Sequence, residues 1–374
     1  MTTATFIILC FEGAVLSFNV AASAAVIPSI AESFALSQFF VGKIIWLYMI
    51  PYGIAALFYG PLVRAFDARR VELICLFCFS LANLWAGLSN NIYSLFAARF
   101  LMGIFGASVI PLGLILIAKH FEANKRGKFV GIFFAATFVA SLLGLFFSGI
   151  VPWRWIYLLP AIAGMLLWVI MFKYLPSFKS DTGKFEINYF SAFKNKTLIG
   201  IFTYIFLISL LYHGVQQWLS VYFSNKYGFN QFTISMLIML TSLSGIFGEV
   251  LGGLFSDSLG RIKTIKLGIW LMIASVFVLI VKLPLFLIAL IMIVWGLGWT
   301  FNHSGLSTIL TDLPKEFLNE SASLNSSVRF VAGGVGVVIG GLLLREDFNF
   351  GFVILGVCLF LLAMFSKRLL KKES

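Results

Sequence analysis

The sequence predicts an all-α membrane protein with twelve spanning helices arranged in two similar six-helix halves. Composition predicts the class: 60% of the 374 residues are hydrophobic, only 11% are charged, and the mean hydropathy is +1.01. A soluble chain of this length needs far more charge to cover its surface. A repeat predicts the halves, because a short hairpin with an acid, a glycine and several bases occurs twice, 193 positions apart.

Twelve apolar stretches approach or exceed the roughly 20 residues that a helix needs to cross a bilayer. They cover residues 5–30, 38–62, 71–89, 92–118, 127–150, 154–175, 197–222, 231–256, 263–281, 284–309, 321–344 and 348–367. The first is too long for the apolar core of a signal peptide, and no basic stretch precedes it. We therefore expect it to be retained as a span.

A polar segment at 176–196 divides this series into six stretches and six. It separates an N-terminal half, 1–175, from a C-terminal half, 197–374. Lysine and arginine gather in this linker, in alternate short loops and at the C-terminus, as they do in loops that face the cytoplasm. We expect a multi-pass protein of the plasma (inner) membrane with both termini inside. Because the +12 net charge is spread over such loops, it does not indicate a nucleic-acid partner.

Smaller sequence matches recur at nearly the same offset. The pairs are residues 138–140 with 330–332, Gly144 with Gly336, and Gly103 with Gly296, at offsets of 192, 192 and 193. Small residues let helix backbones approach closely in lipid. Parallel six-helix repeats of this kind are one of the plans on which secondary transporters are built.

The second hairpin, Gly253-Leu-Phe-Ser-Asp257-Ser-Leu-Gly260-Arg261-Ile-Lys263, resembles the loop signature of the major facilitator superfamily. Arg99 with Gly103 and Gly106, and Trp153-Arg154-Trp155-Ile156-Tyr157, are similar to motifs of its drug:proton antiporter branch. The resemblance covers nearly the whole chain. It implies two halves that rock to give alternating access, with spans 1, 4, 7 and 10 lining a central cavity.

The first hairpin departs from that signature. Arg64 stands at the position of the aspartate and Asp67 at that of the glycine, and only Arg69 and Arg70 keep the basic end. Gly60 starts this degraded copy. In the fifth span, residues 140–141 are Ala-Ser where antiporters carry glycine-proline.

Ionisable side chains at membrane depth are costly, so each is a candidate functional group. Glu12 lies in the first span with Asn19 seven residues later on the same helical face. A carboxyl group in an apolar cavity is suited to binding and releasing a proton. The alternative for Glu12 is a permanent structural pair with a base.

Two bases fall toward the outer third of the bilayer. Arg99 stays protonated, so it does not carry a proton itself. It could keep a neighbouring acid ionised, bind an anionic substrate or cap helix carbonyls, and the resemblance implies a coupling role. Lys43 either takes part in this chemistry or extends toward the outer headgroups.

Glu249 and Arg329 have similar expected depths, so an ion pair between them is geometrically possible. Between helices that separate during transport it would be a gate, and within one rigid half it would only be structural. His213 and His303 are either cavity residues or ordinary polar residues with satisfied hydrogen bonds. With three histidines in the chain and no acidic cluster, we expect no metal site.

In the second hairpin, the resemblance implies that Asp257 contacts the N-terminal dipole of a helix across the two halves. Gly260 would form the turn, and Arg261 would pair with acids at the cytoplasmic face. The alternative is an ordinary charged turn. Because Arg64 replaces the twin acid, the corresponding contact of the first hairpin, near Gly60 and Arg69, is expected to be weak or absent.

Aromatic and amide side chains on spans 7 and 10 are candidates for binding an amphipathic organic solute. They are Tyr204, Gln216, Gln217, Trp295, Trp299 and Asn302. Since aromatic residues make up 17% of the chain, packing against lipid or core is the alternative for each.

These observations predict a monomeric, proton-coupled secondary transporter that exports a drug-like or metabolic solute. The alternative is uptake of an organic anion or nutrient, which the excess of bases over acids at depth favours. No nucleotide-binding G-x-x-x-x-G-K-[ST] signature occurs, and no nucleophile-base cluster is evident. We therefore expect neither an enzyme nor a cofactor, and the partners are the solute, protons and the lipid bilayer.

Overall fold

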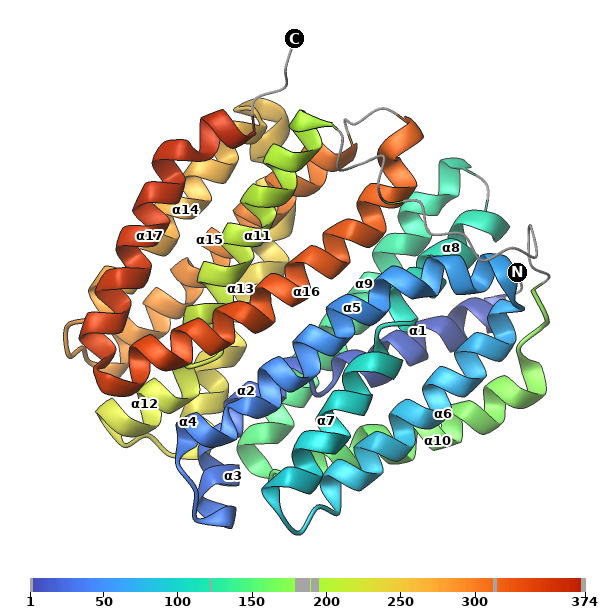
Figure 1. Cartoon of the computed structure of the whole chain (residues 1–374), viewed down its shortest axis with the longest axis horizontal. Coiled ribbons are helices and arrows are strands. Elements are labelled where there is room, and N and C mark those ends of the chain that lie inside the picture. Colours follow the sequence, from blue (N-terminus) through green and yellow to red (C-terminus); the bar gives the residue numbers. More distant parts are fainter. Residues whose placement is uncertain (1–2, 122, 179–188, 190–194, 312–314, 371–374) are drawn as a thin grey trace. The chain divides into compact units, whose positions relative to one another are not determined.

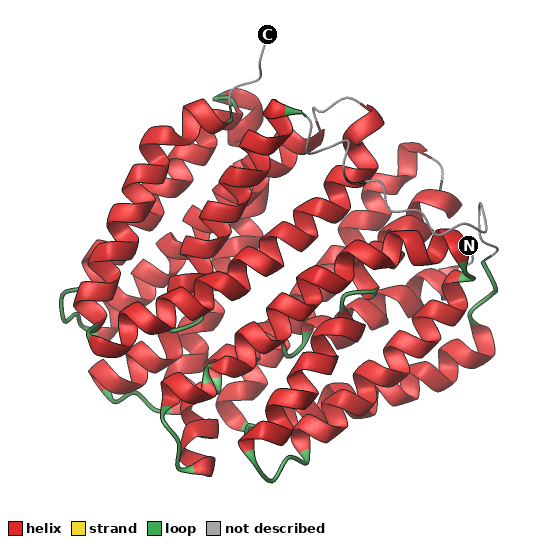
Figure 2. Ribbon diagram, viewed as in Figure 1, coloured by secondary structure: helices red, strands yellow, loops and turns green. Residues whose placement is uncertain are grey.

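The computed structural model of the chain describes residues 3–121, 123–178, 189, 195–311 and 315–370 (Figure 1). These residues form helices and connecting loops, with no strand among them (Figure 2). The chain divides into two compact units, Met1–Ile187 and Asn188–Ser374. The boundary lies inside the segment 176–196 that separates the two sets of apolar stretches.

The first unit contains α1 (Thr3–Ser17), α2 (Val20–Ala25), α3 (Ile27–Phe34), α4 (Gln38–Val41), α5 (Lys43–Ala65), α6 (Ala68–Gly87), α7 (Ile92–Gly106), α8 (Val109–His120), α9 (Ala123–Ile150) and α10 (Trp155–Tyr174). The second contains α11 (Lys196–Gln216), α12 (Leu219–Tyr227), α13 (Gln231–Ser258), α14 (Arg261–Leu279), α15 (Leu285–Thr311), α16 (Lys315–Glu346) and α17 (Phe348–Leu369). In the described part of the chain, these helices supply 12 segments long and apolar enough to cross a membrane, which confirms the predicted number.

The two units pair their helices in the same order. In the first, α5 packs on α7, α6 on α10 and α1 on α9; in the second, α13 packs on α15, α14 on α17 and α11 on α16. In each unit the second span therefore packs on the fourth, the third on the sixth and the first on the fifth. The predicted major facilitator architecture of two similar six-helix halves is confirmed.

Glycine contacts repeat with the helices. A Cβ atom at Gly144 of α9 would collide with the carbonyl of Phe18, and one at Gly336 of α16 would collide with the carbonyl of Leu210. Both glycines and both carbonyls are 192 positions apart. Each of these spans is thus held so close to its neighbour that only a hydrogen fits between them.

A second pair of contacts follows the same rule. A Cβ atom at Gly103 of α7 would collide with the carbonyl of Tyr48, and one at Gly296 of α15 with the carbonyl of Thr241. Here the offset is 193 for both the glycines and the carbonyls. The sequence repeat is therefore a repeat of backbone contacts.

Polar side chains set several helix starts. Asn91, Asn195, Asn230 and Asp347 each accept a hydrogen bond from a backbone N–H in the first turn that follows. Such caps satisfy donors that a helix cannot satisfy itself. They fix where each span begins and hence the depth of the side chains within it.

Spans 1, 4 and 7 are each interrupted, and a further break at Gly42 separates α4 from α5 near the start of span 2. Breaks separate α1 from α2 at residues 18–19, α7 from α8 at 107–108, and α11 from α12 at 217–218. A regular helix satisfies its backbone groups internally, so a break in lipid needs polar or backbone partners nearby. Ser23 supplies such a partner at the first break, where its Oγ donates to the backbone carbonyl of Asn19 at 2.7 Å.

Candidate functional site

Two carboxyl groups meet in the interior of the first unit. Glu12 on α1 is 1% exposed and Glu72 on α6 is 0% exposed. The two carboxyl groups are close enough to share a hydrogen bond when one of them carries a proton. Two ionised carboxylates only accept hydrogen bonds, so a hydrogen bond between them would need a proton on one of them. The neighbour of Glu12 is thus another acid, not the base that a permanent structural pair would need.

The surroundings of the pair are weakly polar and uncharged. Tyr59 on α5 donates its hydroxyl proton to the carbonyl of Ile104 at 2.8 Å, and Cys75 on α6 lies 3.6 Å from the Tyr59 oxygen. Neither glutamate forms an ion pair or any other hydrogen bond within the described residues. A buried pair without a countercharge is favoured in a state that holds at least one proton.

A second polar contact joins the same two helices nearer the break in the first span. The amide of Asn19 donates to Asn83 on α6 at 2.6 Å, and Asn83 donates to the carbonyl of Phe79 at 2.9 Å. Asn19 and Asn83 are both 0% exposed. Asn19, in the break after α1, therefore contacts α6, the helix that also carries Glu72.

Arg99 on α7 lies in a separate aromatic setting. It is 1% exposed, and its Nε donates to the carbonyl of Ile44 on α5 at 3.0 Å. Its guanidinium lies 4.4 Å from the ring centre of Tyr48 and 5.8 Å from that of Tyr157. Arg99 thus binds a helix carbonyl through Nε, while its Nη1 is buried without a hydrogen-bond partner among the described residues. The coupling and anion-binding roles of Arg99 stay predictions. Lys43 lies 4.3 Å from the ring centre of Phe40.

The first hairpin is joined by hydrogen bonds to α6, to α10 and to the segment after α10. Asp67 caps α6 by accepting from the Arg69 N–H at 3.0 Å. It also accepts from Ser177 Oγ at 2.6 Å and from the Phe178 N–H at 2.8 Å, which ties the segment after α10 to the hairpin. Arg69 donates to the carbonyl of Phe172 at 2.6 Å, near the end of α10. Gly60 is buried within α5.

These contacts set the acidity of Asp67, which lies outside the spanning segments. Partial burial by itself would raise the pKa of Asp67. The hydrogen bonds from Ser177, Phe178 and Arg69, together with the charge of Arg70, outweigh it, so the pKa lies below its ordinary value. The carboxylate is therefore stabilised in its charged form.

Replacing Asp67 with alanine is expected to destabilise the first unit by about 1–2 kcal/mol at pH 7, the range for a lost helix cap. Because folding lowers the pKa of Asp67, its electrostatic contribution is present above the unfolded pKa, near 4, and is lost as pH falls through the folded value. Asp67→Asn keeps the cap and removes the charge. Thermal unfolding of both variants between pH 7 and pH 3 separates the contribution of the cap from that of the charge. If the loss of stability in Asp67→Asn did not shrink toward pH 3, the charge contribution would be contradicted.

Aromatic rings gather in the second unit. Tyr212 on α11 stacks on Trp299 of α15 with ring centres 3.9 Å apart and on Trp295 at 5.4 Å. His213 lies edge-on to Trp299 at 5.8 Å and is linked to Gln217 by a 3.2 Å hydrogen bond. Trp299, His213 and Gln217 are partly exposed, so the stack has an accessible polar side.

Hydrogen bonds fix the orientation of this stack. Trp295 donates to the Gln216 oxygen at 2.7 Å, and the Gln216 amide donates to Thr241 on α13 at 3.2 Å. Tyr204 donates to Asn302 at 2.7 Å. Spans 7 and 10 are joined by these bonds, so the predicted aromatic and amide residues do come together, although Trp295, Tyr204 and Asn302 are buried.

The carboxylate of Glu249 contacts a histidine where an arginine was considered. Its Oε1 lies 2.6 Å from His303 Nδ1. Arg329 on α16 is close enough to Glu249 for an electrostatic effect but makes no direct ion pair with it. Its Nε donates to Asn325 at 2.7 Å, and its guanidinium lies 5.8 Å from the Trp299 ring centre. Both Arg329 Nη atoms are buried and find no hydrogen-bond partner among the residues that the structure describes.

The second hairpin has the turn that its sequence predicts. Asp257 is exposed in the last turn of α13, and α14 begins at Arg261. Gly260 between them has φ of 94°, a value that favours glycine over any residue with a side chain.

Comparison with known families decides the identity. The sequence profile described as Major Facilitator Superfamily matches residues 9–341. The chain belongs to this superfamily. Major facilitator proteins are transporters, and the chain is an integral multi-pass membrane transporter rather than an enzyme.

Related major facilitator transporters cover most of the chain. YbcL of Bacillus subtilis, an MFS-type transporter, is 23% identical over 89% of this chain and 88% of its own length. The purine ribonucleoside efflux pump NepI of Salmonella enteritidis is 20% identical over 89% and 85%. The chloramphenicol resistance protein CraA of Acinetobacter baumannii is 24% identical over 73% and 70%. The crystal structure of a mutant of the nucleoside transporter NupG shares the fold, with a TM-score of 0.77 at 15% identity over 98% of this chain and 100% of that one.

Sequence reasoning about this major facilitator protein missed Glu72. It follows the charged hairpin by only a few residues, so it looks like a group at the membrane surface. A usable signal was periodicity: Glu72, Leu76, Phe79 and Asn83 fall on one face of α6, and all four are buried. The helical face on which an acid lies therefore indicates its burial better than its distance from the helix end does.

Proposed function

We propose that this transporter exports a small organic solute in exchange for protons and that the Glu12–Glu72 pair is its proton-binding site. The observation that carries the proposal is the burial of two contacting carboxyl groups with no cation against them in the described residues. Such a pair holds one proton readily, and losing it leaves two adjacent buried negative charges. A rearrangement that admits water to the pair lowers the cost of that loss.

Coupling follows if solute binding and proton binding favour different access states. Each ligand then changes the affinity for the other by the same factor, which is about 5- to 150-fold for typical coupling free energies. Glu12 lies on α1 and Glu72 on α6, so movement of either helix changes the separation of the two carboxyl groups. Binding or loss of the proton thereby favours one arrangement of α1 and α6 over another, and this arrangement differs between the access states.

The relatives support export over uptake. NepI is named an efflux pump and CraA a resistance protein. The stack of the buried Tyr212 on the partly exposed Trp299, with Gln217 and His213 beside it, is suited to a flat amphipathic solute. We therefore propose a drug-like or metabolic compound with an aromatic ring as the exported solute.

A second candidate, uptake of an organic anion, is favoured by Arg329. Its two Nη atoms are buried, lack a partner within the described part of the chain and lie near the Trp299 ring. A carboxylate or phosphate of a solute would satisfy both donors together. On this alternative the same aromatic stack would hold the apolar part of the anion.

Transport by membrane vesicles under an imposed pH gradient tests both candidates. Export predicts that cationic dyes move only with a gradient and that Glu12→Gln stops the movement while the protein remains folded. Anion uptake predicts accumulation that Arg329→Gln abolishes and Glu12→Gln leaves intact. Solute flux that ignores the gradient would refute proton coupling and leave a facilitator.

Asp257→Asn is expected to shift the balance of access states more than Arg64→Ala does. The reason is that only the second hairpin keeps the acid of the family signature, and we propose that this acid stabilises one access state. Spin labels at the cytoplasmic ends of both halves measure the distance distribution. Two variants with the parent's distribution would remove any latch role for Asp257.

A further inference from the structure

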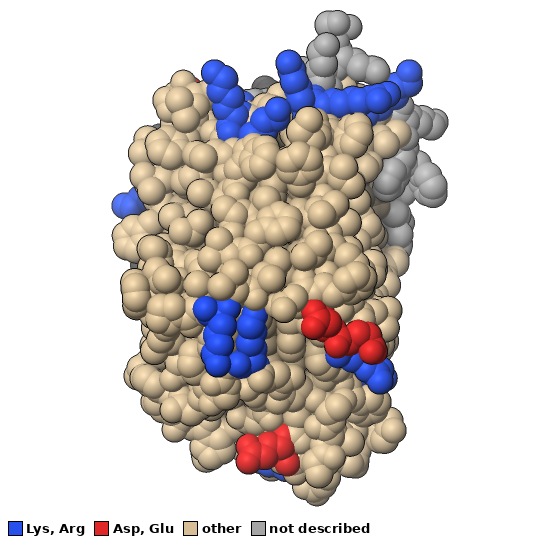
Figure 3. Space-filling view, turned by 90° about the vertical axis from the view of Figure 1, so that its left-hand side faces the viewer, with Lys and Arg blue, Asp and Glu red and all other residues tan. Residues whose placement is uncertain are grey.

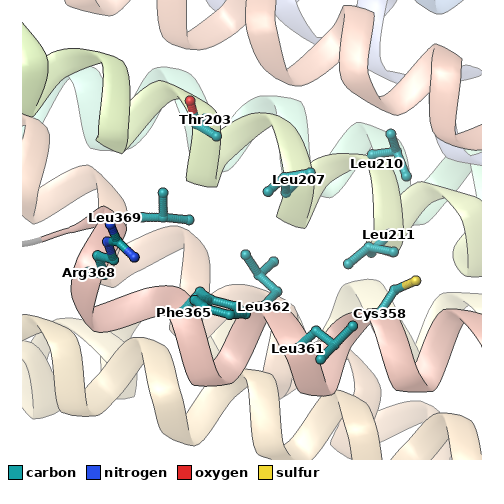
Figure 4. A pocket seen from close by; sticks show the side chains of 10 residues that line it. All are labelled: Thr203, Leu207, Leu210, Leu211, Cys358, Leu361, Leu362, Phe365, Arg368 and Leu369. Carbon is teal, nitrogen blue, oxygen red and sulfur yellow. The ribbon is translucent and has the colours of Figure 1, made fainter.

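An apolar groove of about 550 Å³ runs between α11 and α17 in the second unit (Figure 4). Leucines of α11 line one side of it, and leucines with Phe365 and Cys358 of α17 line the other. The complete lining is Thr203, Leu207, Leu210, Leu211, Cys358, Leu361, Leu362, Phe365, Arg368 and Leu369. No residue of the sequence-predicted site takes part in it.

The groove exists because α11 and α17 touch at two points and separate between them. A Cβ atom at Gly200 of α11 would collide with the carbonyl of Leu369, so the helices are in contact there. They approach again at Gly214, where a Cβ atom would lie 3.6 Å from Leu355. Leu211 and Leu362 are 6% and 5% exposed and form the floor.

The rim of the groove is apolar and open. Leu207, Leu361 and Phe365 are 36%, 49% and 55% exposed. Exposed apolar side chains on a membrane-spanning helix are covered by lipid chains. On α17 the lining extends from Cys358 to Leu369, about 16 Å of helix, or roughly the depth of one leaflet of a 30 Å hydrocarbon core.

One end of the groove is cationic. Arg368 lies there, beside Leu369 (Figure 4). Within the described residues, its guanidinium has no ion pair or hydrogen bond. Figure 3 shows Lys and Arg without Asp or Glu along the upper end of the face around α14 and α17, a broad band of uncharged side chains below them, and charges of both signs in the lower part. Lys367, Arg368, Lys263 and Lys266 all belong to helix ends on that side.

We propose that this groove is a binding site for one anionic phospholipid, with an acyl chain between α11 and α17 and the phosphate on Arg368. The groove accepts a chain along one leaflet, and the arginine provides bidentate donors where the headgroup lies. A bound chain fills the space between the first and last spans of the second unit. The lipid thereby becomes part of the packing that α11 must change when it moves.

Native mass spectrometry of the purified transporter with added phosphatidylglycerol or phosphatidylcholine tests the site. The parent is expected to retain one phosphatidylglycerol that phosphatidylcholine does not displace at equal concentration. Arg368→Gln should weaken its binding about fivefold, the effect of one basic residue at a lipid surface. Lys367→Gln is the matched control, because Lys367 is the adjacent base and does not line the groove.

A second variant separates the groove from the charge. Leu207→Trp places a large ring over the rim, where the side chain is already 36% exposed, and should lower retention while Arg368 is intact. Equal losses for Arg368→Gln and Lys367→Gln would mean only general surface attraction and overturn the proposal. Retention unchanged by Leu207→Trp would overturn the acyl-chain position, and equal retention of both lipids would overturn the anionic selectivity.

Discussion

Glu12→Gln and Glu72→Gln are each expected to remove the dependence of transport on a pH gradient. Flux driven by the gradient should fall by about 5- to 150-fold, the factor that corresponds to typical coupling free energies. Glutamine has nearly the shape of glutamate and can donate to the remaining carboxylate. The polar contact between α1 and α6 is therefore kept while the proton-binding pair is lost. Exchange of solute down its own gradient should continue, because neither change touches the aromatic stack of the second unit.

The control for this pair is Glu32→Gln, which removes an exposed carboxylate of the same unit. Its flux should follow the pH gradient as the parent's does. Flux is measured in proteoliposomes with the gradient set in both directions, alongside thermal unfolding. If Glu12→Gln and Glu72→Gln kept the parent's gradient dependence, the pair would be structural and proton coupling would need another group.

Gly144→Ala is expected to cost about 3 kcal/mol of stability, the upper end for an overpacked core. The added methyl meets the backbone carbonyl of Phe18, and a backbone carbonyl cannot rotate aside as a side chain can. Gly336→Ala should behave in the same way against the carbonyl of Leu210 in the second unit. Thermal unfolding of the purified protein in detergent measures the loss.

Gly131→Ala provides a matched control in the same helix as Gly144. Nothing lies within 4 Å of a Cβ atom there. Alanine should leave stability unchanged or raise it by up to about 1 kcal/mol, because glycine weakens a helix interior. Equal unfolding temperatures for the Gly144 and Gly131 variants would contradict close backbone contact between α9 and the first span.

The membrane-spanning fold was readable from the sequence because hydropathy and length act locally. An apolar run of about 20 residues has few other stable structures in lipid, so the twelve spans follow from composition. The glycine repeats at 103 and 296 and at 144 and 336 were also readable. The residues that these glycines contact are also equivalent in the two units: Tyr48 corresponds to Thr241, and Phe18 to Leu210. The sequence repeat alone did not reveal these two correspondences.

The partners of the ionisable groups could not be predicted in the same way. Partner choice depends on helix rotation and tilt, which sequence depth does not define. Glu249 and Arg329 have similar depths, yet His303 lies closer to the carboxylate. The sequence showed Asp67 only as a departure from the family signature. Its structural role was hidden because two donors to its carboxylate, Ser177 and Phe178, lie more than 100 positions away in the sequence.

The interruptions of spans 1, 4 and 7 divide each of these spans into a longer and a shorter helix. Bending at residues 18–19, 107–108 or 217–218 turns one segment about the other without breaking a continuous ladder of helical hydrogen bonds. A bend at a break moves the shorter segment relative to the longer one, whose own contacts, such as Leu210 with Gly336, are kept. Each six-helix bundle therefore contains points at which one part of a span can bend independently of the rest of the bundle.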